Sequence, residues 1–485
     1  MVTANGPCTA PDVVDVVALG ESMVTFLPSR PGRLADVPSF ARGIGGAESN
    51  VACVLAAAGH ATRWVSRVGE DGFGDHLVEA IGAYGVDVSA VRRDPARPTG
   101  VYFRTAGDRA GDGHEVAYYR AGSAASAMTV ENVDMAAIRA ARVLHLSGIT
   151  AALSADCLRL LRELTAPAAG RPLISFDVNH RPGLWRDADG ARVLLELARR
   201  ADIVFVGEDE AEEAWGVTGG AAAIRALLPE PAVLVVKDGA RGATVFENTA
   251  PRTAAAGAPP PPPHTTEPAP APAPKPGAVR DGAAGAPVSG RAGDSGGAVV
   301  PGRADDVAGA PVSWRAGDSG GAGGRADDGG GAVVSGGAGD VGGWPGPSAT
   351  GSSAAGTPPA DAGVTQSAPG HASGAAPAMA PGRGAAVTFV PAPAVVVAAA
   401  VGAGDAFAAG FLSATLRNLP TRDRLRHGHL MAAAALTVPG DLATPPTRDH
   451  ADRLAALDDD AWGTLRLGPG WTHAVDRAPE EVRTP

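Results

Sequence analysis

The sequence predicts an α/β protein built on a central, mostly parallel β-sheet with helices on both faces. Two observations lead to this fold class. Short runs rich in Val, Ile, Leu and Phe recur through the first half of the chain, as expected of strands that are buried on both sides. Stretches of helical periodicity lie between successive runs, and this alternation is typical of a parallel sheet.

The elements follow in order along the chain. Buried strands are expected at residues 13–19, 62–67, 143–147, 173–177, 203–206 and 233–237. Helices are expected at residues 49–58, 75–84, 156–164, 191–200 and 221–228. Residues 22–27, 101–104 and 116–119 instead alternate apolar and polar side chains, which predicts exposed strands. We interpret these strands, within about residues 22–40 and 99–120, as a small β lid.

Residues 250–383 consist almost wholly of Ala, Gly, Pro, Ser, Asp and Arg. GAPVSGRAGDSGGA returns there as GAPVSWRAGDSGGA, yet two copies with almost no Leu, Ile or Phe cannot build a core. We therefore expect a disordered insert at the tip of a hairpin formed by residues 243–246 and 386–390, where a long loop adds little closure entropy. Expansion of a surface loop without function is favoured over a partner-binding segment. The folded core then comprises residues 11–249 and 384–470, followed by a flexible tail at 471–485.

Composition excludes several classes of protein. A formal charge of −11 and a pI near 5.5 leave no basic surface for nucleic-acid binding. Three widely spaced cysteines, Cys8, Cys53 and Cys157, do not provide a disulfide framework or a zinc site. The N-terminus has no charged start followed by an apolar run, and the most apolar stretch, residues 395–412, contains glycines and Asp405. We expect a cytoplasmic protein that binds neither nucleic acid nor membrane.

The strongest chemical motif is VGAGDAFAAGFL at residues 401–412. Gly402, Ala403 and Gly404 carry almost no side chain, so consecutive backbone N–H groups at a helix start can converge on an anion. Asp405 then falls in the first helical turn, where its carboxylate can take the proton of an attacking hydroxyl. A purely structural turn before a helix is the alternative for this segment alone, since Asp is favourable in a first turn.

A second motif, GIGGAESN at residues 43–50, precedes a helix. Gly45 and Gly46 allow a ligand to approach the backbone, and Asn50 can both donate to and accept from hydroxyl groups. The alternative is an ordinary strand-to-helix turn with Asn near its cap.

A third set of residues is spread along the chain and offers positive charge. Tyr118 and Arg120, with Asn179 and Arg181 after a predicted strand, have the side chains needed to hold a carboxylate by charge-assisted hydrogen bonds. Ligands bind at the carboxyl edge of open α/β sheets, where Asn179 and Arg181 are expected. Each arginine taken singly is equally typical of a surface ion pair. His427 and His429, on an Arg-rich helical stretch, are interpreted as surface residues.

Together these segments resemble the ribokinase-like (phosphofructokinase-B type) carbohydrate kinases, most of all the 2-keto-3-deoxygluconate kinases. GGAESNVACVLAAAGH is similar to the family's N-terminal signature and VGAGDAFAAGFL to its C-terminal one. RVGEDGFGDHL, TGVYFR, YYRAGSAAS, HLSGIT, FDVNHRPGLW and VVKDGARGA lie between them in the family's order. The resemblance covers the chain from Val13 to about Thr447, except for the insert.

The resemblance implies a specific activity and a set of roles. The reaction would be ATP-dependent phosphorylation of the terminal hydroxyl of 2-keto-3-deoxygluconate, with Mg²⁺ as the metal. Asp405 would be the catalytic base, with Gly402 to Gly404 as the anion hole. Sugar contacts would come from Gly45, Gly46, Asn50, Tyr118, Arg120, Asn179 and Arg181. Nucleotide contacts would come from Lys237, Gly239 and Gly242, and Glu210 would organise the metal through water. The lid would pair between subunits in a homodimer or higher oligomer.

Two positions depart from the family pattern. The family has Asp-Thr or Asp-Pro where Ala399 and Ala400 stand, and the missing carboxylate normally helps to bind a monovalent cation. We therefore expect weak or absent activation by potassium, and reduced turnover. The family's NxxE motif aligns with residues 207–210, where Gly207 replaces the asparagine while Glu210 remains. Metal binding should persist, less tightly.

Two alternatives remain open. Within the same class, the acceptor is another small sugar, such as fructose or a deoxy-inositol derivative. From a different class, the protein is a weakly active nucleotide- and sugar-binding sensor that works through its insert. Retention of Asp405 with its flanking glycines favours the enzyme, because a protein without activity need not keep an acid at a helix start.

Overall fold

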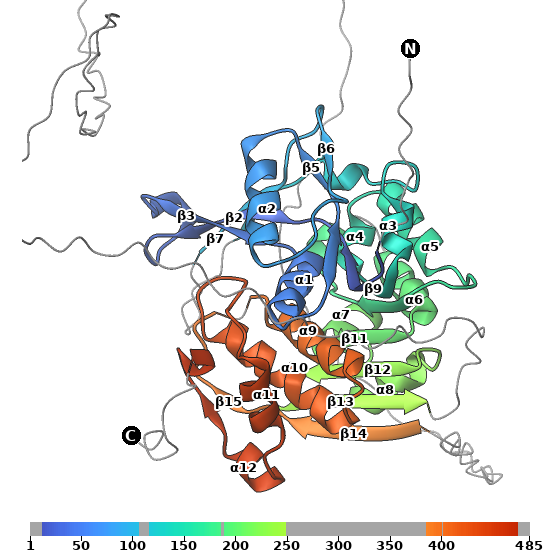
Figure 1. The fold of residues 1–485 in the computed structure, drawn as a ribbon, viewed down its shortest axis with the longest axis vertical. Coiled ribbons are helices and arrows are strands. Elements are labelled where there is room, and N and C mark those ends of the chain that lie inside the picture. The colour runs from blue at the N-terminus through green and yellow to red at the C-terminus, as the bar shows by residue number, and fades with distance from the viewer. Residues whose placement is uncertain (1–11, 106–115, 186–188, 249–384, 400, 474–485) are drawn as a thin grey trace, which may run out of the picture. The chain divides into compact units, whose positions relative to one another are not determined.

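A computed structural model describes residues 12–105, 116–185, 189–248, 385–399 and 401–473. Its centre is an eight-stranded sheet (Figure 1). In spatial order the strands are β14 (Ala385–Pro391), β13 (Gly242–Asn248), β12 (Val233–Asp238), β11 (Ile203–Gly207), β10 (Leu173–Asp177), β9 (Ala141–Ser147), β1 (Val14–Leu19) and β4 (Thr62–Val65). The six strands from β12 to β4 are parallel, whereas β13 and β14 pair antiparallel. The predicted fold class is confirmed.

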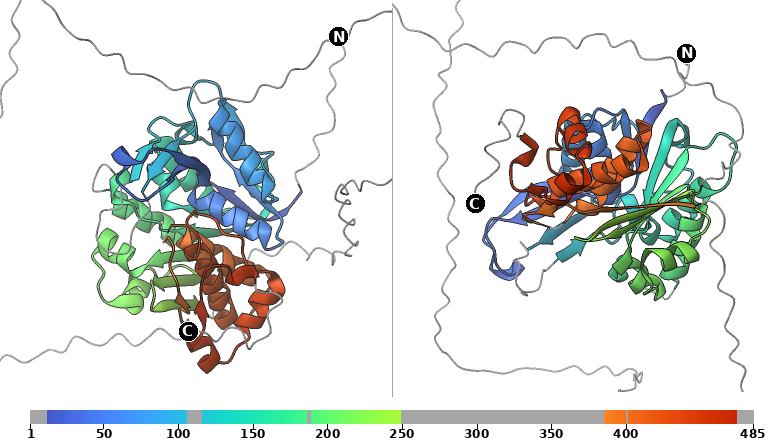
Figure 2. Two further views of the ribbon diagram at one scale, coloured as in Figure 1. Left: turned by 90° about the vertical axis from the view of Figure 1, so that its left-hand side faces the viewer. Right: turned by 90° about the horizontal axis from the view of Figure 1, so that it is seen from below.

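Helices cover both faces of this sheet (Figures 1 and 2). One face packs against α3 (Met135–Arg139), α4 (Gly148–Ala152), α5 (Ala155–Thr165), α6 (Gly190–Arg200), α7 (Glu208–Trp215) and α8 (Gly220–Leu227). The other face packs against α1 (Ala47–Ala57), α9 (Ala403–Leu416), α10 (Thr421–Leu436), α11 (Arg448–Ala455) and α12 (Asp459–Gly463). Alternate residues of each central strand enter opposite cores: Val204 and Val206 lie in the first, Ile203 and Phe205 in the second. This explains why the strands are apolar on both sides.

The helices begin where the sequence supplies acceptors for their first N–H groups. Ser154 accepts a hydrogen bond from the backbone N–H of Cys157 and starts α5. Asp71 accepts from the N–H groups of Phe73 and Gly74 and starts α2 (Gly72–Ala83), which packs beside β4 and the small sheet. The helical prediction is therefore correct within a few residues at each end.

The predicted lid strands form a separate four-stranded sheet. Its order is β3 (Phe40–Gly45), β2 (Met23–Pro28), β7 (Val101–Arg104) and β8 (Val116–Tyr119), with β2 and β7 parallel and the outer pairs antiparallel. Strand β3 was not among the predicted strands. Two-stranded pairs complete the described structure: β5 (Arg67–Gly69) with β6 (Arg92–Asp94), and β15 (Ala394–Val395) with β16 (Arg466–Leu467).

The insert joins a regular hairpin. Strands β13 and β14 pair from Gly242↔Pro391 to Asn248↔Ala385, so the residues flanking the low-complexity segment face each other directly. This is the predicted hairpin. The segment itself, residues 250–383, lies outside the described residues.

The two histidines of α10 correct a prediction. His427 and His429 were interpreted as surface residues, but their exposures are only 2% and 6%. His427 Nε2 lies 3.1 Å from the Asp452 carboxylate of α11, and His429 Nε2 lies 3.1 Å from the Val390 carbonyl oxygen of β14. The interpretation was wrong because α11 and β14 pack over these two histidines. The sequence of α10 alone does not show which other elements will pack against it.

At the C-terminal end, Trp471 is 9% exposed within the second core, although it stands at the start of the segment expected to be a tail. Residues 474–485 lie outside the described residues. None of the helices in the described part of the chain has the length and hydropathy of a membrane span.

Replacing residues 249–384 by Asn-Gly should leave the fold intact and keep or raise the Tm. A two-residue turn suits the Asn248↔Ala385 register, and a shorter loop lowers the entropic cost of bringing the two strands together. Calorimetry on the full chain and the shortened chain measures this. Gly242→Val is the contrasting variant: its φ is +144° and a Cβ there would stand 2.3 Å from the Val390 oxygen, so its Tm should fall. A shortened chain that fails to fold would contradict the prediction.

Candidate active site

Most of the polar residues singled out in the sequence line one cleft at the carboxyl edge of the parallel strands. The cleft has a volume of ≈ 1620 Å³, more than the roughly 300–1,000 Å³ of pockets for one small ligand. The candidate residues along it are Gly45, Gly46, Asn50, Tyr118, Arg120, Asn179, Arg181, Glu210, Lys237, Gly402, Gly404 and Asp405. The space is therefore large enough for more than one small molecule, and Asp405 is among the residues that line it.

The first turn of α9 forms one wall of the cleft. Gly402 has φ +77°, and a Cβ there would stand 2.2 Å from the Asp441 carbonyl oxygen, so both conformation and space require glycine. No side chain caps the helix that starts at Ala403, which leaves its first backbone N–H groups available to an anion. Ala399 precedes this turn with its N–H directed at the Leu436 oxygen, 3.3 Å away, while Ala400 lies outside the described residues.

Asp405 sits in this first turn and contacts α1. Its Oδ2 accepts a hydrogen bond from Asn50 Nδ2 at 2.9 Å. Burial raises the pKa of Asp405 to about 7, Asp177 adds to the rise, and Asn50 and Lys237 oppose it. The Oδ1 atom of Asn50 is buried without a hydrogen-bond partner, so Asn50 can hold the base and accept from a ligand hydroxyl at once. A carboxyl that titrates near neutrality is suited to general-base chemistry.

Lys237, at the end of β12, pairs with Asp177, at the end of β10. The Nζ–Oδ2 distance is 3.0 Å. Burial by itself lowers the pKa of Lys237, but Asp177 and Glu210 outweigh it, so the pKa is raised and the ammonium stays charged. Asn179, two residues after Asp177, has φ +41° and a buried Oδ1 without a hydrogen-bond partner. A non-glycine residue held in this conformation over a cleft is typical of a functional position.

Glu210, predicted to organise a metal, and Arg181, predicted to bind the sugar, lie next to each other in the cleft. Glu210 Oε2 accepts the Gly207 N–H at 2.8 Å, and Oε1 lies 3.4 Å from Arg181 NH1. Among the described residues no group of three His, Cys, Asp or Glu is arranged to hold a metal ion.

The lid side of the cleft presents Tyr118 and Arg120. Arg120 forms an ion pair with Glu21, which is 1% exposed in its side chain and also accepts from Ser123 Oγ at 2.5 Å. Arg120 Nε is buried without an acceptor, and Tyr118, beside the guanidinium, is 52% exposed. Glu21 was not identified in the sequence, because one acid after a strand carries no spacing signal.

Two glycines bring the backbone close to the same space. A Cβ on Gly45 would stand 2.3 Å from the Tyr102 hydroxyl, and a Cβ on Gly46 would stand 2.4 Å from the Glu21 carbonyl oxygen. Gly239 and Gly242 instead form the turn between β12 and β13, with φ values of +50° and +144°, and are not among the cleft-lining residues. Their predicted contact with nucleotide stays a prediction.

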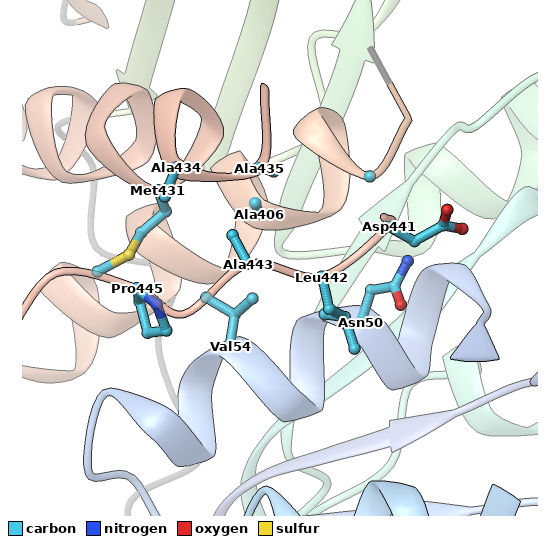
Figure 3. A pocket seen from close by; sticks show the side chains of 11 residues that line it. Asn50, Val54, Ala406, Met431, Ala434, Ala435, Asp441, Leu442, Ala443 and Pro445 are labelled. Carbon is cyan, nitrogen blue, oxygen red and sulfur yellow. The ribbon is translucent and has the colours of Figure 1, made fainter. Parts of the chain in front are cut away.

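Asp441 connects the lid to the turn that begins α9. Tyr102 donates a hydrogen bond to Asp441 Oδ2 at 2.6 Å, and Arg104 lies 2.8 Å from Asp441 Oδ1. Figure 3 shows Asp441 on the segment after α10, with Asn50 beside it and an apolar gap between α1 and the C-terminal helices. Burial raises the pKa of Asp441, while Arg104 and Tyr102 favour its ionised form. The sequence did not identify these three residues as a unit, because 339 positions separate Tyr102 from Asp441.

Asp405→Asn should raise the Tm above pH 7 by a few degrees. The pKa of Asp405 is about 7 in the folded protein against an ordinary value of 3.8, so the folded protein loses stability as the pH rises from about 4 to about 7 and the carboxyl ionises. The amide keeps an acceptor for Asn50 without the charge. Calorimetry at pH 5 and pH 8 should give a larger gain at pH 8. An equal gain at both pH values would contradict the raised pKa.

Comparison with known proteins agrees with this geometry. Residues 14–266 and 372–448 match the pfkB family carbohydrate kinases. The 2-dehydro-3-deoxygluconokinase of Thermoproteus tenax is 35% identical over 253 residues, 50% of this chain and 77% of that protein. The corresponding Bacillus subtilis enzyme is 39% identical over 41% of this chain and 62% of its own length. Fructokinase-1 of Zea mays is 32% identical over 42% of this chain and 62% of its own length.

Solved structures share the fold. A PfkB protein from Polaromonas is 25% identical, with a TM-score of 0.55 over 90% of this chain and 99% of that one. The 2-dehydro-3-deoxygluconokinase of Thermotoga maritima is 18% identical, with a TM-score of 0.55 over 91% and 99%. A ribokinase-type protein from E. coli, solved with ATP and Mg²⁺, is 15% identical, with a TM-score of 0.56 over 90% and 98%. The family match over both halves of the core shows that this chain belongs to the pfkB family of carbohydrate kinases.

Proposed function

We propose that this protein transfers the γ-phosphoryl group of ATP to the terminal hydroxyl of 2-keto-3-deoxygluconate or a similar sugar acid. The observation that carries the proposal is Asp405 itself. Its carboxyl lies in the first turn of an uncapped helix, titrates near neutrality and is held by Asn50 within the cleft. A base and an anion site side by side are what phosphoryl transfer to a hydroxyl requires.

In the reaction, the hydroxyl oxygen attacks the γ-phosphorus and its proton passes to the Asp405 carboxylate. The bond from the γ-phosphorus to the bridging oxygen breaks, and ADP leaves with the electron pair. Gly402, Ala403 and Gly404 direct backbone N–H groups at the transferring phosphoryl, and the ammonium of Lys237 adds positive charge beside Gly404. Asn50 keeps the base oriented toward the acceptor.

ATP with Mg²⁺ is the proposed phosphoryl donor. The E. coli relative was solved with both. Mg²⁺ would neutralise phosphate charge when bound, and Glu210 is the residue that would orient it. Arg181, 53% exposed in its side chain next to Glu210, is placed to meet either a phosphate or the acid end of the sugar. Because Ala399 removes the family's carboxylate, potassium should not stimulate turnover.

A sugar acid is favoured over a neutral sugar on two grounds. The two 2-dehydro-3-deoxygluconokinases match at 35% and 39% identity, against 32% for the maize fructokinase. The lid side also holds Arg120, whose Nε has no acceptor among the described residues, beside exposed Tyr118. Fructose is the second candidate acceptor, because the Glu21 carboxylate already balances the charge of Arg120.

The outer face of the lid is suited to pairing with a second copy. Phe26, Phe40, Phe73, Phe103 and Tyr119 form a connected group of rings with centroid distances of 4.6–5.9 Å. Phe73 and Tyr119 are 39% and 66% exposed. Phe73 of α2 and Tyr119 of β8 thus expose apolar surface over partly buried rings, and exposed apolar surface is typical of an interface.

Tyr119→Glu should therefore shift the protein from dimer to monomer in sedimentation velocity experiments, because a charge at this interface would be desolvated. Leu173→Glu, at a 52% exposed site away from the lid, is the control and should leave the oligomeric state unchanged. A wild-type protein that sediments as a monomer would refute the lid interface.

The kinase proposal is tested by ATP consumption with 2-keto-3-deoxygluconate, gluconate, ribose and fructose, with and without potassium. We expect turnover on the keto-deoxy acid, no response to potassium, and a loss of about a thousandfold in kcat for Asp405→Ala. Turnover on fructose alone would show that fructose is the acceptor and would leave the proposed kinase activity standing. No turnover, combined with binding of ADP and a sugar acid in calorimetry, would favour the sensor alternative.

A further inference from the structure

Asp177, at the carboxyl end of β10, is among the residues that line the cleft, although only 3% of its surface is exposed. Its Oδ2 accepts from Lys237 Nζ at 3.0 Å, and its Oδ1 accepts from the Asn179 backbone N–H at 3.0 Å. Both oxygens are engaged, so the carboxylate is held in one orientation. The mechanism proposed above gives this residue no role.

Lys237 reaches across β11 from β12 to Asp177 on β10. The same ammonium lies at the start of α9, because a Cβ added to Gly404 would stand 3.5 Å from Nζ. The ion pair therefore lies beside both the anion-facing N–H groups and Asp405. A fixed pair of opposite charges at this position acts on any charge that forms there.

We propose that Asp177 is a positioning residue: it holds the Lys237 ammonium at the start of α9, beside Asp405 and the N–H groups that face an anion. The kinetic part of this inference rests on the proposed function, whereas its stability part does not.

Other groups also act on Asp405. Arg181, from the loop after β10, lowers the pKa of Asp405 as Lys237 does, and it lies 3.4 Å from Glu210 of α7. Asn50 from α1 is neutral, and His145 from β9 is uncharged because burial and Lys237 lower its pKa to about 3. Burial is the main cause of the raised pKa of Asp405, with Asp177 adding to it and Lys237 opposing it. Removing the charge of Asp177 should therefore lower the pKa of Asp405, and removing the charge of Lys237 should raise it.

The kinetic test compares the pH dependence of kcat/KM for Asp177→Asn and Lys237→Met with that of the wild type. Asp177→Asn should move the acidic limb about one pH unit lower, and Lys237→Met about one unit higher. Asp177→Asn should also introduce an alkaline limb, because Lys237 without its carboxylate partner loses its proton more easily in a buried site. Lys237→Arg keeps the positive charge and should restore the wild-type acidic limb.

Asp202→Asn is the matched control. Asp202 is 9% exposed, pairs with Arg171 at 2.7 Å and precedes β11 at the opposite edge of the sheet from Asp177. It is a buried, ion-paired carboxylate of the same kind, so its substitution should lower the Tm without moving either limb. A shift of the acidic limb in this control would show that a general loss of packing causes such shifts.

The stability test needs no activity. The gain in Tm from Asp405→Asn should grow as the pH rises and level off once the pH passes the pKa of Asp405 in the folded protein. The pH at which the gain levels off should fall in the Asp177→Asn background and rise in the Lys237→Met background. Levelling-off points that stay fixed, or that move the same way, overturn the inference even if the wild type is an active kinase. Opposite shifts in a protein without turnover uphold the inference and reject the proposed function.

Discussion

The active site depends on the partial burial of a single carboxyl, that of Asp405, in the first turn of α9 where it contacts α1. In water this carboxyl would be ionised at neutral pH. In the protein its pKa is raised to about 7, so the ionised form is destabilised. The surrounding structure has to supply the stability lost in this way, and the two apolar cores on either side of the sheet do so. The same burial provides the chemistry, because a carboxylate that prefers to be protonated takes a proton readily near neutral pH.

Asp441 extends this arrangement to the lid. Its carboxylate is bound by Tyr102 and Arg104 of β7, and its carbonyl oxygen lies where a side chain on Gly402 would stand. One residue therefore contacts both the lid sheet and the turn that begins α9. Any movement of the lid that breaks the Tyr102 and Arg104 bonds leaves a buried carboxylate unpaired, which is costly. The lid and the anion-facing turn are thus coupled through one side chain.

The sequence was sufficient for the parts of the fold that depend on local pattern. Strands such as Leu173–Asp177 are apolar over their whole length, and the motif around Asp405 joins small residues to a helix start, so both are recognisable without a structure. The residues that were missed act through distant pairing. Glu21 meets Arg120 only when the lid strands assemble, and Asp441 meets Tyr102 only when the C-terminal segment reaches the lid. His427 and His429 were misplaced for the same reason, since burial of a helix face is decided by elements elsewhere in the chain.

The charges of the cleft explain how one site can combine anionic substrates with an acidic base. Arg120 is paired with Glu21, Arg104 with Asp441, Arg181 with Glu210 and Lys237 with Asp177. Each pair has one cation and one carboxylate, so Asp405 is left as the charge without an ion-pair partner among these cleft residues. A strongly positive site would hold Asp405 ionised but would weaken it as a base, and a strongly negative one would repel ATP. Paired charges avoid both outcomes, and the arginine and lysine donors remain close enough to turn toward a phosphate or a carboxylate when a substrate enters.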